Sequence, residues 1–297
     1  IILNINKLYI MSNITVGIPT HKRPRLLLRS LNGLLENHHS NVKIVVSIDG
    51  IDETHNDYLE IEKKFPNSFI EFIYHKENIG SLNNFLFLRN HCKTEYFMWL
   101  ADDDEISCTT IINLYSLLKT EVSACTVVPY WELLNEKNQK KLIKSSFFGQ
   151  ESLFKRVISY CYNSDDAFFY GLHRTEILKK CSFKGYWWPN KISLSNWCYV
   201  FQMDLILRGK IIFLDDKKFK WINHDYGKKF YPRSSSDKFF KYFAYLSRRI
   251  NVYYLYLEKL LKAKKFTIFA IIFFISFFLL IRDLLFRGPA FHKVQFK

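Results

Sequence analysis

Short apolar runs alternate with stretches of helical periodicity through the first half of the chain. The apolar runs have the length and β-branched content of buried strands and cover residues 14–19, 42–49, 69–74, 96–100 and 124–130. Helical patterns lie between them, over residues 25–35, 57–64, 81–90 and 109–119. Strands that alternate with helices predict an α/β fold, with a mostly parallel sheet and helices on both faces.

The second half is less regular but still predicts ordered structure. Helices are expected near residues 152–161 and over about 196–208, where Gly209 marks an end, and a strand is expected over 211–214. The chain has 297 residues, of which 48% are hydrophobic, so it can bury a sizeable core. This composition excludes a disordered protein.

After Pro232 the pattern becomes that of an amphipathic helix. Apolar residues recur at spacings of three and four, at Phe239, Phe243, Leu246, Ile250, Tyr253, Leu257 and Leu260. Sixteen uncharged residues, 266–281, follow between Lys264-Lys265 and Arg282. As a helix they measure roughly 24 Å, a little short of a bilayer core. We expect both segments to associate with a membrane, as a short span or in its plane, and a buried core helix is the alternative.

The charge distribution supports a basic C-terminal surface. The formal net charge is +15, and residues 206–297 carry 20 Lys and Arg against 6 Asp and Glu. Lys and Arg interleave with aromatic residues over 217–265, as in some nucleic-acid binders, but the adjoining apolar run favours anionic lipid headgroups. We therefore expect no nucleic-acid partner. Six scattered cysteines and no recognisable signal peptide predict the cytoplasmic face of the membrane, with residues 1–10 outside the fold.

Three of the expected strands end in polar residues. Pro19, Thr20 and His21 follow the first, Asp49 and Gly50 the second, and three consecutive aspartates at 102–104 the fourth. Ligands gather at the carboxyl ends of parallel strands, so these residues are expected to converge on one site. Any one of them could instead belong to a turn or cap a helix.

The three aspartates also predict a metal ion. Adjacent carboxylates repel one another unless a cation neutralises them. Hard oxygen ligands suit Mn²⁺ or Mg²⁺, and either ion could bridge the oxygens of a diphosphate. A solvated acidic loop that caps the next helix, near Thr109, is the alternative.

The motifs ITVGIPTHKRPRLLLRSL, VVSIDG, ENIGSLNN and YFMWLADDDE, in this order, resemble glycosyltransferase family 2, whose members have the GT-A fold. The resemblance covers residues 13–130 well and 131–230 loosely. It implies a nucleotide-sugar-binding half over 11–130 and an acceptor-binding half over 131–232. The pattern and charge after Pro232 make residues 233–297 a membrane-associating tail.

The resemblance also implies roles for individual residues. The residues that would bind the nucleotide are Pro19, Thr20, His21, Asp49, Asn78 and Asp102. The family's Asp-x-Asp (DXD) signature matches only in part, because its first position falls on Ala101. Asp103 is then the best metal ligand, with Asp104 beside it. His224, in WINHDYG, resembles a late histidine that some members place against the metal or pyrophosphate, although lone histidines are often structural.

Inverting members of the family use a carboxylate as the general base for the acceptor hydroxyl. The expected position falls near Asn196, and an amide cannot act as that base. Asp165, Asp166 and Asp204 are the available substitutes, and Asp166 is preferred. A capping role for Asp166 and a salt-bridged role for Asp204 are the structural alternatives.

These inferences predict an inverting enzyme that moves a sugar from a nucleotide sugar, most simply a UDP-sugar, to an acceptor hydroxyl. The acceptor would be a glycan or a lipid-linked precursor of a surface polysaccharide. A catalytically inactive membrane scaffold and a basic nucleic-acid- or lipid-binding protein remain the alternatives. A nucleotidylyltransferase is disfavoured, because no glycine-rich phosphate loop opens the chain.

Overall fold

The computed structural model describes residues 12–65, 69–134, 140–143, 152–163, 167–183, 197–222, 250 and 252–282. The first half contains the predicted elements within a few residues: β1 (Ile14–Thr20), α1 (Pro24–Leu35), β2 (Val42–Ile48), α2 (His55–Lys64), β3 (Ile70–Tyr74), α3 (Ser81–His91), β4 (Tyr96–Trp99) and α4 (Cys108–Thr120). The second half contains β5 (Ala124–Leu134), β6 (Lys140–Ile143), α5 (Leu153–Asn163), the 3₁₀ turn η1 (Ala167–Tyr170), β7 (Leu172–Arg174), α6 (Thr175–Lys180), α7 (Trp197–Arg208), β8 (Lys210–Ile222) and α10 (Phe266–Arg282).

The described strands form one eight-stranded sheet in the order β3-β2-β1-β4-β7-β5-β6, with β8 also paired to β5. The strands β1 to β4 are parallel, and β8 runs parallel to β5. The short strand β7 is antiparallel to both of its neighbours, β4 and β5. The predicted α/β fold with a mostly parallel sheet is therefore confirmed.

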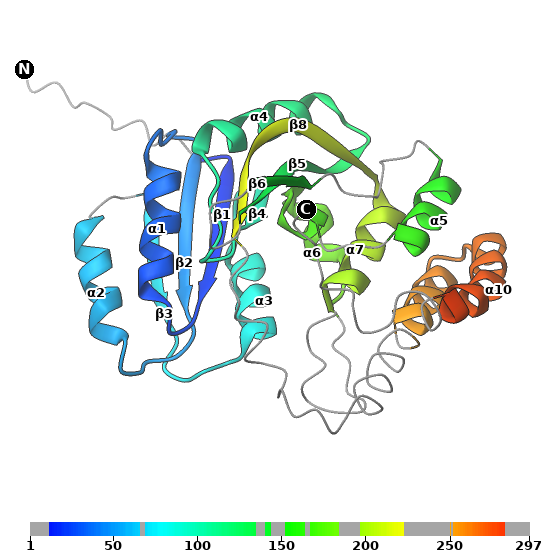
Figure 1. Ribbon diagram of the computed structural model, residues 1–297, viewed down its shortest axis with the longest axis horizontal. Coiled ribbons are helices and arrows are strands. Elements are labelled where there is room, and N and C mark those ends of the chain that lie inside the picture. Colours follow the sequence, from blue (N-terminus) through cyan, green and yellow to red (C-terminus); the bar gives the residue numbers. More distant parts are fainter. Residues whose placement is uncertain are drawn as a thin grey trace, which may run out of the picture.

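Helices cover both faces of the sheet, as predicted. Alternate residues of β4 face opposite sides: Tyr96 and Met98 belong to a core cluster with α1, α2 and α4, and Phe97 and Trp99 to a second cluster with α3, α5 and α7. Burial on both faces explains why the strands are nearly continuous apolar runs. Figure 1 shows α2 at one end of the molecule and α5 with α10 at the other.

The C-terminal helices belong in part to this core, which corrects one expectation. A helix over residues 252–262 buries Val252, Tyr253, Tyr256 and Leu260 in the cluster that also contains α5 and α7. Of the predicted stripe, Tyr253, Leu257 and Leu260 therefore pack against protein, whereas Ile250 is 47% exposed. The other predicted positions, Phe239, Phe243 and Leu246, lie outside the described residues. No helix in the described ranges is both long enough and apolar enough to span a bilayer.

Gly17 allows α3 to approach β1 closely, and α3 carries part of the site described below. A Cβ atom at this position would lie 2.9 Å from Cζ of Phe97 and 3.2 Å from Cβ of Leu88. Both neighbours are buried, so neither can move without disturbing the core.

We predict that Gly17→Ala lowers the free energy of unfolding by about 1–3 kcal/mol, because the added methyl overpacks the junction of β1 and α3. Urea denaturation measures this change. Gly33→Ala is the matched control. Its Cβ would be 3.9 Å from the nearest atom, inside α1, and it should leave stability unchanged or raise it by about 0.5–1 kcal/mol. Equal effects of the two substitutions would contradict the role given to Gly17.

Candidate active site

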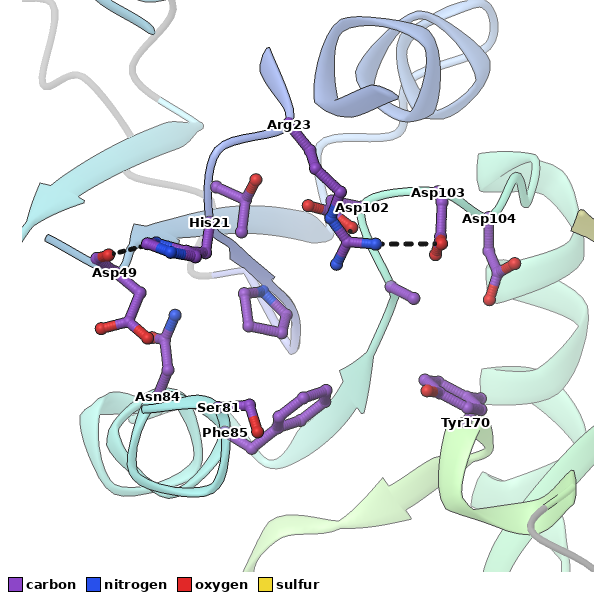
Figure 2. A pocket seen from close by; sticks show the side chains of 13 residues that line it. His21, Arg23, Asp49, Ser81, Asn84, Phe85, Asp102, Asp103, Asp104 and Tyr170 are labelled. Carbon is purple, nitrogen blue, oxygen red and sulfur yellow. Dashed lines mark hydrogen bonds and ion pairs between the residues drawn. The ribbon is translucent and has the colours of Figure 1, made fainter. Parts of the chain in front are cut away.

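A cavity of ≈ 380 Å³ lies where β1, β2 and β4 end (Figure 2). The N-terminal part of α3 and the end of η1 also line it. Its lining contains Pro19, Thr20, His21, Arg23, Asp49, Ser81, Asn84, Phe85, Ala101, Asp102, Asp103, Asp104 and Tyr170. The polar residues predicted from the three strand ends therefore converge in one place, as the parallel topology requires.

Asp49 connects the end of β2 to the segment before α3, on one side of the cavity. Its side chain is buried, and Oδ1 accepts a hydrogen bond of 2.7 Å from the backbone N–H of Ile79. Its backbone carbonyl accepts one of 2.7 Å from Nδ1 of His21 (Figure 2). The next residue, Gly50, has φ of +93°, and a Cβ there would lie 3.0 Å from the backbone nitrogen of Asn78. Only glycine fits this turn without strain.

Asn78 lies beside the cavity and is not among the residues that line it. Its side-chain amide donates to Nε2 of His21 at 3.2 Å, and its oxygen accepts from the backbone N–H of Gly80 at 2.9 Å. The structure thus gives Asn78 a positioning contact with His21. The predicted contact of Asn78 with the nucleotide stays a prediction.

The acidic cluster after β4 meets a cation that the sequence analysis did not single out. Arg23 leaves the loop after β1, and its Nη2 lies 2.8 Å from Oδ1 of Asp102. Its Nη1 donates to Oδ2 of Asp103 at 3.1 Å. Arg29 of α1 donates to the backbone carbonyl of Asp103 at 2.7 Å. A guanidinium therefore already supplies part of the neutralising charge that we attributed to a metal.

Asp102 is the most deeply buried of the three carboxylates, with an exposed fraction of 0%. Burial raises the pKa of its carboxyl to about 7, although the charge of Arg23 opposes the rise. Neither oxygen forms a well-aligned hydrogen bond, so the contact with Arg23 is an ion pair. Such a carboxylate becomes more stable in its charged form when a further cation approaches.

The acidic loop has no capping role. Ser107 is the N-cap of α4 instead, and its Oγ accepts from the backbone N–H of Thr110 at 3.2 Å. In the part of the chain that the structure describes, no three His, Cys, Asp or Glu residues are grouped as metal ligands. The donor set still fits Mg²⁺ or Mn²⁺, because such ions need only one or two protein carboxylates when substrate phosphates supply the rest. Asp102, Asp103 and Asp104 all line the cavity, so the predicted ligands Asp103 and Asp104 are both in a position to supply such carboxylates.

Several lining residues were missed by the sequence analysis, and aromatic packing places two of them. Phe169 in η1 stacks on Trp99 with ring centroids 4.5 Å apart, which brings the next residue, Tyr170, to the cavity. Trp99 also donates its indole N–H to the carbonyl of Phe85 at 3.1 Å. No sequence signal marks Tyr170, since stacking partners far apart in the chain leave no local pattern.

Asn84, on the first turns of α3, is another buried residue that the sequence analysis missed. Its side-chain N–H donates to the carbonyl of Ser47 at 3.1 Å, and its Oδ1 is buried without a partner. This oxygen is therefore available to a ligand N–H or O–H in the cavity. The motif ENIGSLNN contains Asn84 and could have suggested it.

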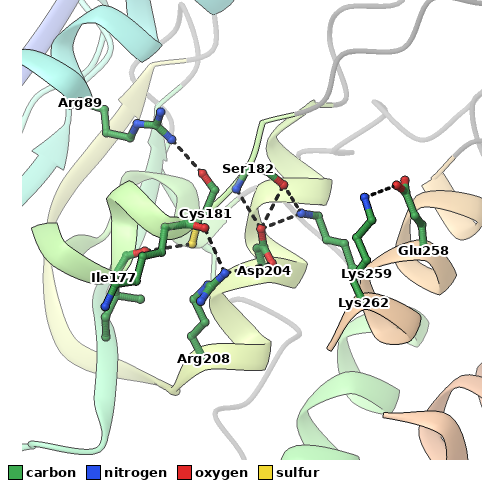
Figure 3. A network of polar contacts seen from close by, with 10 residues as sticks. Arg89, Ile177, Cys181, Ser182, Asp204, Arg208, Glu258, Lys259 and Lys262 are labelled. Carbon is green, nitrogen blue, oxygen red and sulfur yellow. Dashed lines mark hydrogen bonds and ion pairs between the residues drawn. The ribbon is translucent and has the colours of Figure 1, made fainter. Parts of the chain in front are cut away.

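Asp204 does not line the cavity but joins a polar network between α7, Ser182 and the helix over 252–262 (Figure 3). It accepts from the backbone N–H of Ser182 at 2.9 Å and from Nζ of Lys259 at 2.6 Å, and Arg208 lies 3.9 Å away. Lys259 comes from the helix over 252–262, so the network fastens this helix to α7. The geometry supports the salt-bridged alternative for Asp204 and gives no support to a role as general base.

Four residues considered for catalysis or metal binding lie outside the described residues: Asp165, Asp166, Asn196 and His224. Their assignments stay predictions. Asp166 directly precedes η1 in the chain, and the last residue of η1, Tyr170, lines the cavity.

We predict that the carboxyl of Asp102 makes a contribution to the stability of the metal-free protein that decreases as the pH rises from about 4 to about 7. The pKa of Asp102 is raised from 3.8 to about 7 in the folded state, so the folded protein holds the proton across this window while the unfolded chain releases it. Asp102→Asn should remove this part of the slope and be more stable than wild type at pH 8, by up to a few kcal/mol. Urea unfolding in EDTA at several pH values measures it, and an unchanged slope would refute it.

We predict that Asp204→Ala lowers the free energy of unfolding by about 3–5 kcal/mol, because it leaves the buried ammonium of Lys259 without its counter-charge. Replacing both partners, as Asp204→Leu with Lys259→Met, should recover most of the loss. Chemical denaturation of the two single variants and the double variant measures the coupling. Additive losses would show that the pair does not fasten the helix.

Comparisons with known proteins agree with this architecture. The TarS 1-349 crystal structure from S. aureus in complex with UDP-GlcNAc has a TM-score of 0.57 at 16% identity, over 82% of this chain and 66% of that one. The mannosyltransferase PcManGT from Pyrobaculum calidifontis, in complex with GDP-Man and Mn²⁺, has a TM-score of 0.50 at 12% identity, over 85% and 65%. These likenesses show the GT-A fold.

The chain thus spans about two thirds of the length of these solved structures. No curated protein matches it in sequence. Residues 15–178, which include every residue that lines the cavity and all of β1 to β4 except Ile14, match the family described as Glycosyl transferase family 2. The chain therefore belongs to glycosyltransferase family 2.

Proposed function

We propose that this protein transfers a sugar from a nucleotide-sugar donor to an acceptor hydroxyl, with inversion at the anomeric carbon and with the help of Mn²⁺ or Mg²⁺. One observation carries the proposal: in a chain of this family, the cavity at the ends of β1, β2 and β4 contains the three carboxylates that follow β4, and two of them, Asp102 and Asp103, pair with the guanidinium of Arg23. This is the combination that a metal-bound diphosphate requires, with cations for the phosphates and hard oxygens for the metal.

The nucleoside part of the donor occupies the side of the cavity formed by β2 and α3. Asp49 and Asn84 supply buried hydrogen-bond acceptors there, and the ring of His21 lies against the carbonyl of Asp49. A UDP-sugar is the preferred donor. TarS was crystallised with UDP and with UDP-GlcNAc, and PcManGT with GDP-Man, so GDP-sugars are the competing class.

The diphosphate lies on the side of the cavity formed by Arg23 and the acidic loop. When bound, the metal neutralises charge on the diphosphate oxygens as the bond to the sugar breaks. Asp102 and Asp103 hold it. The guanidinium of Arg23, already 2.8 Å from Asp102 and 3.1 Å from Asp103, stays in place as a second cation near the leaving group. Phe85 of α3 and Tyr170 of η1, which also line the cavity, keep water from the sugar in part.

Inversion requires a base that removes the proton from the acceptor hydroxyl while the oxygen attacks in line with the departing diphosphate. Asp166 is the candidate for this base. It lies three residues before Phe169, whose ring stacks on Trp99 beneath the cavity. The acceptor is a glycan or a lipid-linked precursor of a surface polysaccharide.

The proposal predicts separable effects of two aspartates on UDP binding. Asp103→Asn should weaken binding in the presence of Mn²⁺ roughly 10- to 100-fold and change metal-free binding little, because it removes a charged metal ligand. Asp49→Asn should weaken binding by a similar factor with and without Mn²⁺, because its contact is with the nucleoside. Titration calorimetry of UDP, with GDP in parallel, measures both effects.

Asp57→Asn is the matched control. Asp57 is an exposed residue in the first turn of α2 and does not line the cavity, so its amide variant should bind UDP like the wild type. If Asp103→Asn keeps full Mn²⁺-dependent affinity, the assignment of the metal to the acidic loop fails. If GDP binds more tightly than UDP, the donor is a GDP-sugar instead.

A further inference from the structure

The helix α10 has two apolar faces that meet different surroundings. One face is buried: Ile268 and Ile272 pack in the core cluster that contains α5 and the helix over 252–262, and Ser276 is buried beside them. The hydroxyl of Ser276 donates back to the carbonyl of Ile272 at 2.6 Å, so this face presents no free polar group. Figure 1 shows α10 at the edge of the molecule, beside α5. The buried face is accounted for by protein packing.

The opposite face of α10 carries large aromatic residues that protein does not cover. Phe274, Phe278 and Phe277 have exposed fractions of 70%, 68% and 64%. Phe266, Phe273 and Ile281 are exposed on the same face, since these positions recur at helical spacings of three, four and seven. Single exposed apolar residues are ordinary, but a continuous aromatic face indicates a surface that binds something apolar.

Basic residues lie at the N-terminal end of this face. Lys264 and Lys265 directly precede α10 and are exposed. The side chain of Lys262 is 67% exposed and forms an ion pair with Glu258, four residues before it. Residues 266–281 contain no charge at all, so the apolar face and the cations occupy separate positions along the helix. Exposed lysines beside an apolar face complement a surface with anionic groups at its exterior and an apolar layer directly below them.

We infer that the exposed face of α10, formed by Phe266, Phe273, Phe274, Phe277, Phe278 and Ile281, docks this protein on an anionic lipid bilayer. The helix lies in the plane of the bilayer surface, because its other face remains packed on α5. The phenylalanines enter the boundary of headgroups and acyl chains, and Lys264 and Lys265 contact the anionic headgroups. This inference does not depend on the proposed function, because it rests on residues outside the cavity.

A second copy of this chain is the other occupant to consider, and charge argues against it. Residues 206–297 carry a net charge of +14, so two copies that meet through this region would bring like charges together. A bilayer with anionic lipids supplies the opposite charge. The same partner then buries the apolar face and pairs with the lysines.

Flotation of the full-length chain with lipid vesicles tests the inference. We expect it to float with vesicles of phosphatidylcholine and phosphatidylglycerol, and less with phosphatidylcholine alone. Phe274→Ser and Phe278→Ser should each reduce the partition coefficient on the order of tenfold, because each removes a large apolar contact. Lys264→Gln with Lys265→Gln should reduce binding to the anionic vesicles only, and added salt should diminish this difference.

Val122→Ser is the matched control. Val122 is 85% exposed at the turn before β5, so the change removes an exposed apolar side chain away from α10. It should leave vesicle binding unchanged. Each variant is also compared with wild type by its thermal unfolding midpoint, so that lost binding is not confused with a lost fold.

A second measurement does not depend on the serine variants. All six native cysteines are buried, so Phe274→Cys introduces a single exposed thiol for an environment-sensitive fluorophore. Its emission should shift to the blue on anionic vesicles, and the same label at Val122→Cys should not shift. Vesicle binding that survives Phe274→Ser, or an absent shift at position 274, would overturn the inference. A concentration-dependent dimer that is lost in Phe274→Ser, without vesicle binding, would assign the face to a second copy.

Discussion

A buried carboxylate at the end of β4 constrains the whole candidate site. Asp102 has no access to solvent, and a charge in that position is costly unless a cation lies close to it. Arg23, at the end of β1, provides that cation and reaches Asp103 as well. The contact therefore joins the ends of two neighbouring strands, and it gives the cavity a positive group before any ligand enters.

Other contacts position the remaining residues around the cavity. The side chain of Asp49 accepts a hydrogen bond from the backbone N–H of Ile79, which positions the segment that leads into α3. The positive φ of Gly50 allows the turn after β2 to pack closely against the backbone of Asn78. On the far side, the stacking of Phe169 on Trp99 orients Tyr170. The site is thus built on strand ends and a helix start, which are more rigid than long loops.

The C-terminal region performs two different structural tasks. The helix over 252–262 completes the core and is fastened to α7 by the buried pair of Lys259 and Asp204. The helix α10 packs on this core with one face and leaves its aromatic face exposed. An apolar stripe in the sequence is compatible with either task, because protein and lipid interiors are both apolar.

The sequence by itself determined the local elements and the strand ends that converge. Periodicities of two and of about 3.6 residues reflect which side chains are buried, and this information is local, so β1 to β4 and the helices between them could be predicted within a few residues. Their parallel order then placed Thr20, Asp49 and Asp103 at one edge. The three-residue strand β7 is too short to show a period. The tertiary structure alone decided which partner each group meets: Arg23 pairs with Asp103 across 80 residues, Asp204 turns to Lys259, and Tyr170 enters the cavity. A local pattern shows that a side chain is buried or charged, but only the packing of distant segments brings its partner within reach.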